Sequence, residues 1–307
     1  MPTFDDALRS LDEAVGAFRD ERKAPGVAWG VVRDGSLVHV GAAGMLRDGE
    51  ERLPDERSVF RIASMTKSFT AATVLLLRDE GRLRLDDAVG DHVPALEGWT
   101  GPTADSGPIT IRQLLTMSSG LPTDDPWGDR QQALALDAFD ALLRARPVVV
   151  WTPGTTFEYS NLGYGILGRV ITTAAGAEYR EVVRDRVLRP LGMSSTVFDE
   201  ADAAETDLAH GYVREGETLV REGRDGYGAL ASMGGLYSTV ADLARWVAGF
   251  LDAVPARDDA EGDHPLRRAA RREMQQPHRM FGAEADAHAA HLAPGIVAGG
   301  YGYGLVA

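Results

Sequence analysis

One stretch decides the fold: Phe60-Arg61-Ile62-Ala63-Ser64-Met65-Thr66-Lys67-Ser68-Phe69-Thr70, which continues into an apolar run ending at Leu77. Residues 65–77 have the length of a helix and are apolar on nearly every face, so they predict a helix buried in a core. Gly81 follows as a C-terminal cap. Ser64 and Lys67 are three residues apart, so both side chains share one face at the positively polarised N-terminal end. A hydroxyl nucleophile is activated in this way.

Lysine is rare in this chain, which makes Lys67 informative. Only two lysines, Lys23 and Lys67, occur among 32 basic residues. Arginine cannot release its proton in a protein, whereas a lysine desolvated in an apolar helix can have its pKa lowered enough to accept a proton from serine. The alternative is an ordinary lysine that reaches from a core helix to the surface, since a Ser-x-x-Lys match occurs about once by chance in a chain of this length. The motif alone leaves both interpretations open.

Composition bounds the class of protein. The 307 residues, 44% hydrophobic and 25% charged, are typical of a globular protein with one large or two modest domains. A net charge of -14 argues against nucleic-acid and anionic-membrane partners, because both need a basic face. The absence of cysteine excludes disulfides, a thiolate nucleophile and Cys-ligated zinc. The acidic N-terminus lacks the basic start and apolar run of a signal peptide, so a cytoplasmic location is expected unless a signal was removed.

Other segments predict the elements around the central helix. Residues 5–22 form an amphipathic pattern, and the β-rich runs 27–32 and 37–40 flank Asp34-Gly35, the usual signal of a hairpin. Further helices are expected at 109–116, 133–144, 162–175, 179–187, 239–251 and 266–274, short strands at 210–213, 218–220 and 301–306, and loops at 124–130, 226–235 and 258–264.

A second motif precedes the helix predicted at 162–175. Pro153-Gly154 demands a turn, so Tyr159 and Asn161 are expected on a loop just ahead of that helix. An extended backbone would point the phenol and the amide to the same side. A turn asparagine beside a packed tyrosine is the alternative.

Metal and nucleotide sites find little support. His288 and His291 are three residues apart but have no third ligand nearby, so we expect surface residues and no metal. The sequence contains no His-Glu-x-x-His motif, P-loop or Gly-x-Gly-x-x-Gly signature. It also lacks a Gly-x-Ser-x-Gly elbow, which removes the commonest α/β-hydrolase interpretation.

Taken together, the motifs resemble the serine β-lactamase-related family, which includes class C β-lactamases, D-Ala-D-Ala carboxypeptidases, D-aminopeptidases and family VIII carboxylesterases. The similar segments are residues 60–70, 109–122, 159–161, 209–212 and 234–239. The resemblance implies an α+β fold, with an antiparallel sheet flanked by helices and a mainly helical region. We expect a single domain over residues 1–307, in which 1–60 supply a helix and hairpin of the sheet region, 61–200 are mainly helical and 201–307 return to the sheet.

The resemblance also implies a mechanism. Ser64 would attack the carbonyl of an ester or amide and form an acyl-enzyme, while Lys67 and Tyr159 share the proton transfers, with the general base left open. Asn161 would hold Lys67 and bind the substrate carbonyl, and the Ser64 N–H would supply half of an oxyanion hole. No metal or organic cofactor is required. The missing signal peptide favours an esterase or a D-stereospecific amidase over a β-lactamase or carboxypeptidase, and the alternative is a sensor-like binding protein that is acylated without turnover or is not catalytic.

The resemblance fails at the family's third motif, Lys-Thr-Gly or His-x-Gly. No lysine follows Lys67, and none of the later histidines is followed by a residue and then glycine. In relatives the motif comes shortly after a Tyr-Gly-Tyr-Gly-Leu strand, and this sequence stops at Tyr301-Gly302-Tyr303-Gly304-Leu305-Val306-Ala307. We therefore expect the C-terminal strands of the sheet to be missing, and a C-terminal segment or a second chain to complete the fold.

Overall fold

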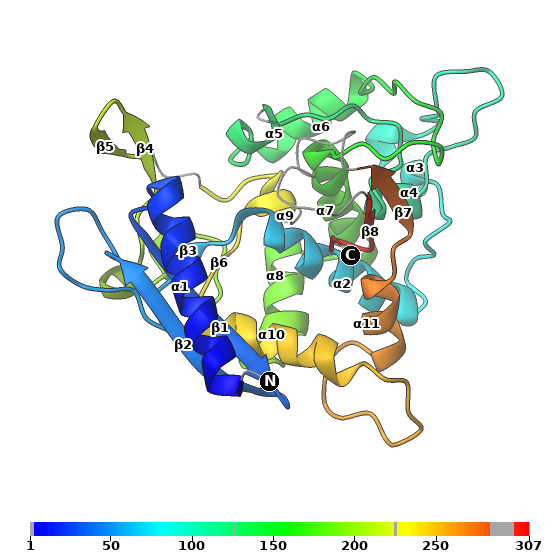
Figure 1. Ribbon diagram of the computed structural model, residues 1–307. Helices are drawn as coiled ribbons and strands as arrows, with labels where there is room; N and C mark the ends of the chain where they lie inside the picture. The colour runs from blue at the N-terminus through cyan, green and yellow to red at the C-terminus, as the bar shows by residue number, and fades with distance from the viewer. Residues whose placement is uncertain (1–2, 126, 224–225, 283–297, 307) are drawn as a thin grey trace. The chain divides into compact units, whose positions relative to one another are not determined.

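The computed structural model describes residues 3–125, 127–223, 226–282 and 298–306 (Figure 1). The chain divides into two compact units, each assembled from three separate segments. The first unit comprises Met1–Ile62, Leu191–Arg224 and Leu236–Asp252, and the second comprises Ala63–Pro190, Asp225–Gly235 and Ala253–Ala307.

Helices and antiparallel strands both contribute, as expected for an α+β fold. The helices are α1 Phe4–Arg22, α2 Thr66–Asp79, α3 Val89–His92, α4 Ile111–Leu115, α5 Trp127–Arg130, α6 Leu136–Arg144, α7 Asn161–Ala175, α8 Tyr179–Val183, α9 Ala231–Gly234, α10 Val240–Asp252 and α11 Arg268–Gln275. The short turns are η1 Ala63–Met65, η2 Pro94–Leu96, η3 Arg184–Leu188, η4 Glu200–Asp202 and η5 Glu205–Asp207. The antiparallel pairs among the described residues are β1 Gly26–Arg33 with β2 Ser36–Gly44, β3 Phe60–Arg61 with β6 Tyr237–Ser238, β4 Tyr212–Glu215 with β5 Thr218–Arg221, and β7 Arg279–Gly282 with β8 Ala298–Tyr301.

The β1–β2 hairpin of the first unit forms where the sequence predicts it. Asp34 and Gly35 both adopt left-handed backbone, with φ of 51° and 76°, and Arg33 pairs with Ser36. Two consecutive residues with positive φ match the right-handed twist of the flanking strands, and asparagine, aspartate and glycine tolerate that conformation best. The Asp34-Gly35 dipeptide therefore sets the register of the hairpin.

Helices pack on opposite faces of this hairpin (Figure 1). The Trp29 indole donates to Asp12 of α1 at 2.9 Å. At the next position, a Cβ on Gly30 would lie 2.7 Å from Val240 of α10. Because successive residues of a strand point to opposite faces, α1 covers one face and α10 the other.

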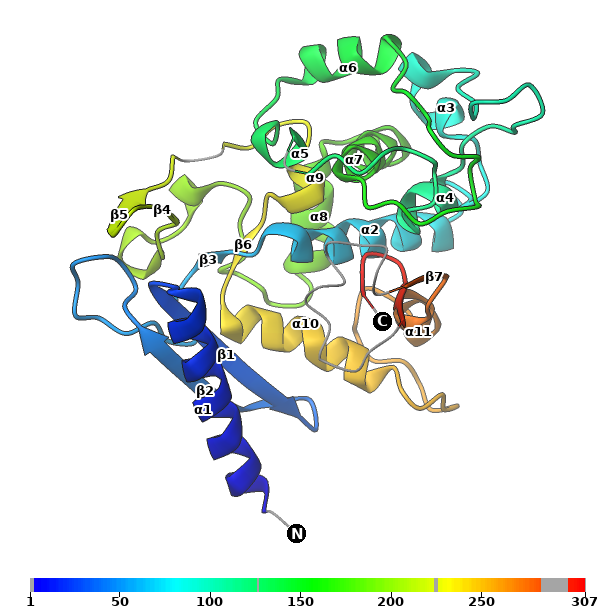
Figure 2. The same cartoon turned by 45° about the horizontal axis from the view of Figure 1, so that its top comes forward.

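Two helices form the core of the second unit. In α2, every residue from Thr66 to Leu77 is buried, and α7 is buried along most of its length. The helices α4, α8, α9 and α11 pack against one or both of them (Figure 2). Glycines let α9 approach α7 closely, because a Cβ on Gly165 would lie 2.7 Å from Leu230 and one on Gly168 would lie 2.5 Å from the Ser232 hydroxyl.

Two segments expected to be loops contain a turn of helix. Residues 124–130 include α5, and the glycine-rich run 226–235 includes α9. Glycine content lowers helix propensity, but tertiary packing overrides a weak local preference. In α9 that packing is visible, because the Ser232 hydroxyl donates to the Tyr164 carbonyl of α7 at 2.8 Å.

The strand predicted at 301–306 is wrong after its first residue. Strand β8 ends at Tyr301, and the chain then turns so that the Gly302 N–H donates to the Leu305 carbonyl at 2.8 Å. The alternating Tyr-Gly pattern imitates the period of a strand, but Gly304 is left-handed, with φ of 70°, and a Cβ there would lie 2.5 Å from the Lys67 carbonyl. His288 and His291 lie outside the described residues. In the described part of the chain, no helix combines the length and apolar character needed to cross a membrane.

Asp242 offers a test of the first unit's stability. Its buried carboxylate accepts from the Ser195 N–H at 2.8 Å and the Thr196 hydroxyl at 2.9 Å, and it pairs with the half-exposed Arg245 at 2.7 Å. We expect Asp242→Ala to lower the free energy of unfolding by about 2–3 kcal/mol, because the buried Thr196 hydroxyl and the Ser195 N–H lose their acceptor. Urea denaturation followed by tryptophan fluorescence measures the change. Arg245→Ala is the control and should cost less than about 1 kcal/mol; equal losses would contradict the assignment.

Candidate active site

Ser64 lies in the η1 turn that leads into α2, rather than in α2 itself. The preceding Ala63 has a φ of 45°, a left-handed conformation that is uncommon for a residue other than glycine. Ser64 is exposed, whereas Lys67 one turn later is only 1% exposed. The three-residue spacing still brings Lys67 Nζ within 3.1 Å of Ser64 Oγ.

The buried Lys67 amine has three oxygen partners from three different elements. Besides Ser64 Oγ, Nζ donates to Asn161 Oδ1 at 2.8 Å and to the Met233 carbonyl at 2.7 Å. Asn161 Oδ1 and the carbonyl can only accept, and a neutral amine has two N–H groups and one lone pair. A neutral Lys67 would therefore donate to these two oxygens and turn its lone pair toward the Ser64 hydroxyl.

Opposing forces set the protonation of Lys67. Burial lowers its pKa to about 7, against the carboxylates of Asp125, Asp129 and Asp124, which raise it. The neutral and charged forms are then both populated near neutral pH. A group with such a pKa can take up a proton and return it at that pH.

Tyr159 approaches Ser64 Oγ as a hydrogen-bond donor. Its hydroxyl donates to Ser64 Oγ at 2.8 Å, and its ring centre lies 4.8 Å from Lys67 Nζ. Burial raises the pKa of the Tyr159 phenol well above its ordinary value, although the hydrogen bond to Ser64 acts in the opposite direction. At neutral pH the phenol keeps its proton. The geometry thus offers Ser64 one group that can accept a proton and one that can donate.

The turn at residues 118–122 positions the segment that carries Tyr159. Gly120 is left-handed, with φ of 83°, and a Cβ there would lie 2.1 Å from the Trp151 carbonyl. The Glu158 N–H donates to the Met117 carbonyl at 2.8 Å. Only glycine permits this approach, so the turn and the Tyr159 segment dock as a pair.

Asn161 is the first residue of α7, and two neighbouring carboxylates hold it. Asp124 accepts from the backbone N–H groups of Asn161 and Leu162, each at 2.7 Å, and so satisfies donors at the helix N-terminus. The Asn161 side-chain Nδ2 donates to the Asp125 carboxylate. With Nδ2 bound there, Oδ1 faces Lys67.

The structure brings together all four residues predicted from the sequence and adds three that the sequence did not reveal. Met233 contributes through its main chain, which leaves no trace in residue identity, and its segment was expected to be a loop. Asp124 and Asp125 follow the Ser-Gly-Leu-Pro turn, separated from it by Thr123. An acidic pair at that position was the one available signal of their role.

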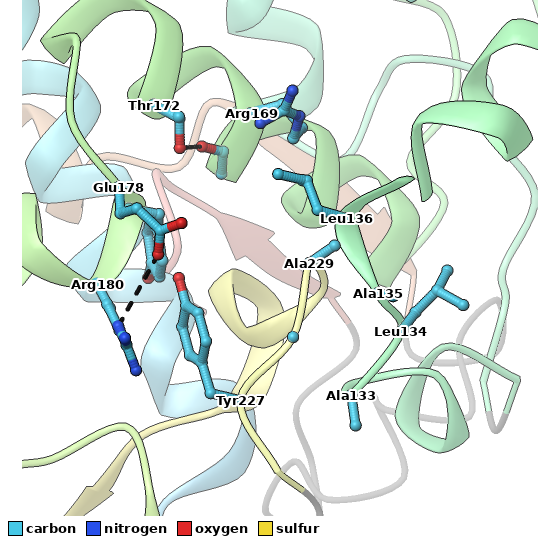
Figure 3. A pocket seen from close by; sticks show the side chains of 13 residues that line it. Ala133, Leu134, Ala135, Leu136, Arg169, Thr172, Glu178, Arg180, Tyr227 and Ala229 are labelled. Carbon is cyan, nitrogen blue, oxygen red and sulfur yellow. Dashed lines mark hydrogen bonds and ion pairs between the residues drawn. The ribbon is translucent and has the colours of Figure 1, made fainter. Parts of the chain in front are cut away.

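A separate cavity of about 410 Å³ lies in the same unit (Figure 3). It is lined by residues that include Gly168, Tyr179 and Ala229, and the Arg180 guanidinium lies 4.9 Å from the Tyr227 ring beside it. None of Ser64, Lys67, Tyr159 and Asn161 lines the cavity. Chemistry therefore argues for the Ser64 cluster as the active site, although a cavity of this size could hold a small molecule. Within the described residues, no group of three or more His, Asp or Glu side chains could hold a metal ion.

Comparison with protein families agrees with this geometry. The family model described as Beta-lactamase matches residues 11–306. The chain belongs to the Beta-lactamase family. This membership confirms the resemblance inferred from the sequence motifs.

Curated relatives in the Beta-lactamase family are longer than this chain. It is 29% identical over 243 residues to the D-alanyl-D-alanine-carboxypeptidase/endopeptidase AmpH of Escherichia coli (strain K12), covering 73% of this chain and 57% of AmpH. It is 34% identical over 204 residues to penicillin-binding protein 4 of Amycolatopsis lactamdurans, which covers 64% of this chain and 51% of that protein. Protein flp of Staphylococcus aureus (strain MW2) is 30% identical over 220 residues, which cover 70% of this chain and 43% of protein flp. The chain thus spans about half the length of these relatives.

Solved structures confirm the fold. The octameric penicillin-binding protein homologue from Pyrococcus abyssi aligns with a TM-score of 0.79 and 26% identity, covering 97% of this chain and 64% of that one. The β-lactamase/D-alanine carboxypeptidase from Yersinia pestis, complexed with citrate, aligns with a TM-score of 0.67 and 28% identity. The alignment covers 87% of this chain and 71% of that one. The expected α+β, β-lactamase-like fold class is correct.

The scarcity of lysine makes the protonation of Lys67 measurable. Selective ¹³C labelling of lysine gives two sets of side-chain signals, which Lys23→Arg assigns. We expect the Lys67 Cε–Hε signal to titrate with a midpoint at pH about 7, because burial outweighs the nearby carboxylates. A midpoint above about 9 would mean that Lys67 is an ordinary ammonium at neutral pH.

Proposed function

We propose that this chain is a serine hydrolase that forms an acyl-enzyme on Ser64. One observation carries the proposal: Ser64 Oγ lies 3.1 Å from Lys67 Nζ and 2.8 Å from the Tyr159 hydroxyl. A hydroxyl is a weak nucleophile by itself and needs a base within hydrogen-bond reach. Membership of the Beta-lactamase family supports the same chemistry.

In this mechanism Lys67 is the general base. The neutral amine takes the Ser64 proton as Oγ bonds to the substrate carbonyl carbon, and the carbonyl electrons move onto its oxygen. When the tetrahedral intermediate collapses, Tyr159 gives its proton to the leaving nitrogen or oxygen, and the Lys67 ammonium restores it. Water then attacks the acyl-enzyme, with the same groups acting in reverse. The pKa of Lys67, about 7, and the raised pKa of Tyr159 support this division of roles.

The remaining roles concern the substrate carbonyl. Asn161 keeps Lys67 in place through the 2.8 Å contact and would also donate to a bound substrate. The Ser64 backbone N–H would stabilise the oxyanion, where a single donor is worth about 10²–10³ in rate. The carbonyl carbon would sit beside Ser64 Oγ, on the exposed side of η1.

The substrates we propose are amides of the D-alanyl peptide or β-lactam type. Two similar proteins are named for activity on such substrates. AmpH is a D-alanyl-D-alanine-carboxypeptidase/endopeptidase, and the Yersinia pestis protein is a β-lactamase/D-alanine carboxypeptidase. The sequence favours an esterase or a D-stereospecific amidase, and the amidase falls in this class. Carboxylic esters react by the same route with a better leaving group.

Ser64→Ala tests the nucleophile. We expect the variant to lose all covalent labelling by a fluorophosphonate and by penicillin, because the attacking oxygen is gone. Intact mass spectrometry measures the adduct, and the exposed neighbour Met65→Ala serves as the control that should still be labelled. Labelling of Ser64→Ala equal to that of the native chain rules out Ser64 as the nucleophile.

The same measurement separates turnover from simple acylation. The native chain is incubated with nitrocefin, p-nitrophenyl acetate and a D-alanine p-nitroanilide while its intact mass is recorded. Turnover of one substrate identifies the class. A stable adduct without turnover would instead favour an acylation-only, sensor-like protein.

Lys67→Arg tests the base. Arginine keeps the positive charge but cannot release its proton, so we expect the acylation rate to fall by about 10²–10⁴-fold, the range of general-base catalysis. Stopped-flow or timed mass spectrometry gives the rate, and circular dichroism checks folding. Lys23→Arg makes the same exchange at an exposed position and should leave the rate unchanged. A Lys67→Arg rate close to native would reduce Lys67 to an electrostatic or packing role.

A further inference from the structure

One acidic side chain, that of Asp125, reaches the catalytic cluster through the Asn161 amide. We propose that Asp125 is a positioning residue, which fixes the orientation of the Asn161 amide toward Lys67 and places a negative charge beside the Lys67 amine. The kinetic part of this inference rests on the proposed function. Its structural part stands on the contacts of Asn161 alone.

The argument begins with the two ends of the Asn161 amide. Nδ2 donates to the Asp125 carboxylate, and Oδ1 accepts from Lys67 Nζ at 2.8 Å. An amide has a donor end and an acceptor end, so a rotation by 180° would exchange them. After that rotation Oδ1 would face a carboxylate and the NH₂ group would face an amine. Both contacts would be lost together, so Asp125 selects the orientation that Lys67 needs.

The surroundings leave Asn161 little room for any other position. A Cβ on Gly128 would lie 2.6 Å from Asn161 Cβ and 3.0 Å from Nδ2, so the backbone of α5 lies directly against the side chain. Asp124 holds the Asn161 backbone N–H at 2.7 Å. The two adjacent carboxylates thus have separate roles, because Asp124 fixes the main chain of Asn161 and Asp125 fixes its side chain.

The charge of Asp125 also acts on Lys67. The charged and titratable groups around Nζ are Asp124 and Asp125 from the loop before α5, Asp129 from α5, Tyr159 from the loop before α7, and Tyr164 from α7, whose ring centre is 5.7 Å away. Among the three carboxylates, Asp125 opposes the effect of burial most strongly. Removing its charge would lower the pKa of Lys67 further. The neutral amine would then persist to lower pH, and the acidic limb of the acylation rate would move to lower pH.

The composition of the chain allows each effect to be followed by a single signal. Asn161 is the only asparagine among the 307 residues, and Lys67 is one of two lysines. Selective ¹⁵N-asparagine labelling therefore reports the Asn161 Nδ2 protons alone in the native chain and in variants that add no asparagine. A variant that adds one shows a second amide pair, which comparison with the native spectrum assigns. Labelling with ¹³C-lysine reports the titration of Lys67. Neither signal depends on catalysis.

Four variants separate the charge of Asp125 from its hydrogen bond. Asp125→Asn keeps an acceptor for Nδ2 and removes the charge, so the Lys67 midpoint should move to lower pH while the Nδ2 protons stay protected from solvent exchange. Asp125→Ala removes both, so the midpoint should move and the protection should be lost. Asp129→Asn removes a nearby charge and should move only the midpoint. Gly128→Ala should disturb the Nδ2 protons without removing any charge, because the added methyl group displaces Asn161.

The rate of Ser64 labelling by a fluorophosphonate across pH forms the kinetic arm. We expect its plateau to fall about tenfold in Asp125→Ala, the equivalent of one hydrogen bond, and to stay within about threefold of native in Asp125→Asn and Asp129→Asn. Thermal unfolding followed by circular dichroism checks that each variant is folded.

The outcomes distinguish the two proposals. If the Nδ2 protons are as protected in Asp125→Ala as in Asp129→Asn, Asp125 does not hold the Asn161 amide. If the Lys67 midpoint in Asp125→Ala equals that of the native chain, the charge of Asp125 does not act on Lys67. Either result overturns the proposal. If Ser64 of the native chain is not labelled, the proposed function fails, and the two NMR signals still decide the role of Asp125. Should Asp125→Ala fail to fold, Asp125→Ser takes its place in both comparisons, because it also removes the charge and withdraws the carboxylate from Nδ2.

Discussion

The second unit depends on burying one amine. An isolated ammonium is costly to remove from water unless partners replace its hydration. Lys67 Nζ forms hydrogen bonds with Ser64 Oγ, Asn161 Oδ1 and the Met233 carbonyl, which come from η1, α7 and α9 respectively. These three elements are far apart in sequence and meet at this nitrogen. The same contacts that make the buried lysine tolerable also aim it at Ser64, so the packing of the core and the chemistry of the cluster are one arrangement.

Burial acts on the two titratable neighbours of Ser64 in complementary directions. Removing water disfavours whichever form is charged, so it lowers the pKa of Lys67 and raises that of Tyr159. Each residue is thereby moved toward its neutral form at neutral pH, one as an amine and the other as a phenol. Charges from Asp124, Asp125 and Asp129 keep the pKa of the lysine from moving further than about 7. A single dry environment thus prepares an acid and a base together.

Local rules in the sequence anticipated much of this structure. The apolar run of α2, the Asp34-Gly35 hairpin and the four residues Ser64, Lys67, Tyr159 and Asn161 follow from periodicity, turn chemistry and family motifs. What the sequence did not reveal is contact between distant segments. The α9 turn forms because it packs on α7, Gly304 breaks the expected strand because the chain closes onto Lys67, and Asp125 matters because it meets Asn161. Propensity and periodicity describe neighbours along the chain and carry no information on such meetings.

The third partner of Lys67 is a peptide carbonyl, and this has a consequence for how the protein tolerates substitution. No side-chain exchange at Met233 deletes the acceptor, so substitutions there act only through the packing of its fully buried side chain. The place of α9 is set instead by the small size of Gly165 and Gly168 on the facing helix. A saturation screen would therefore find that residue 233 needs an apolar side chain that fits the core and that the two helix glycines need to stay small. Neither pattern would reveal the carbonyl that binds the lysine. The carbonyl oxygen makes the contact with Lys67. The residues that cannot change are instead those of the packing surface that holds α9 in position.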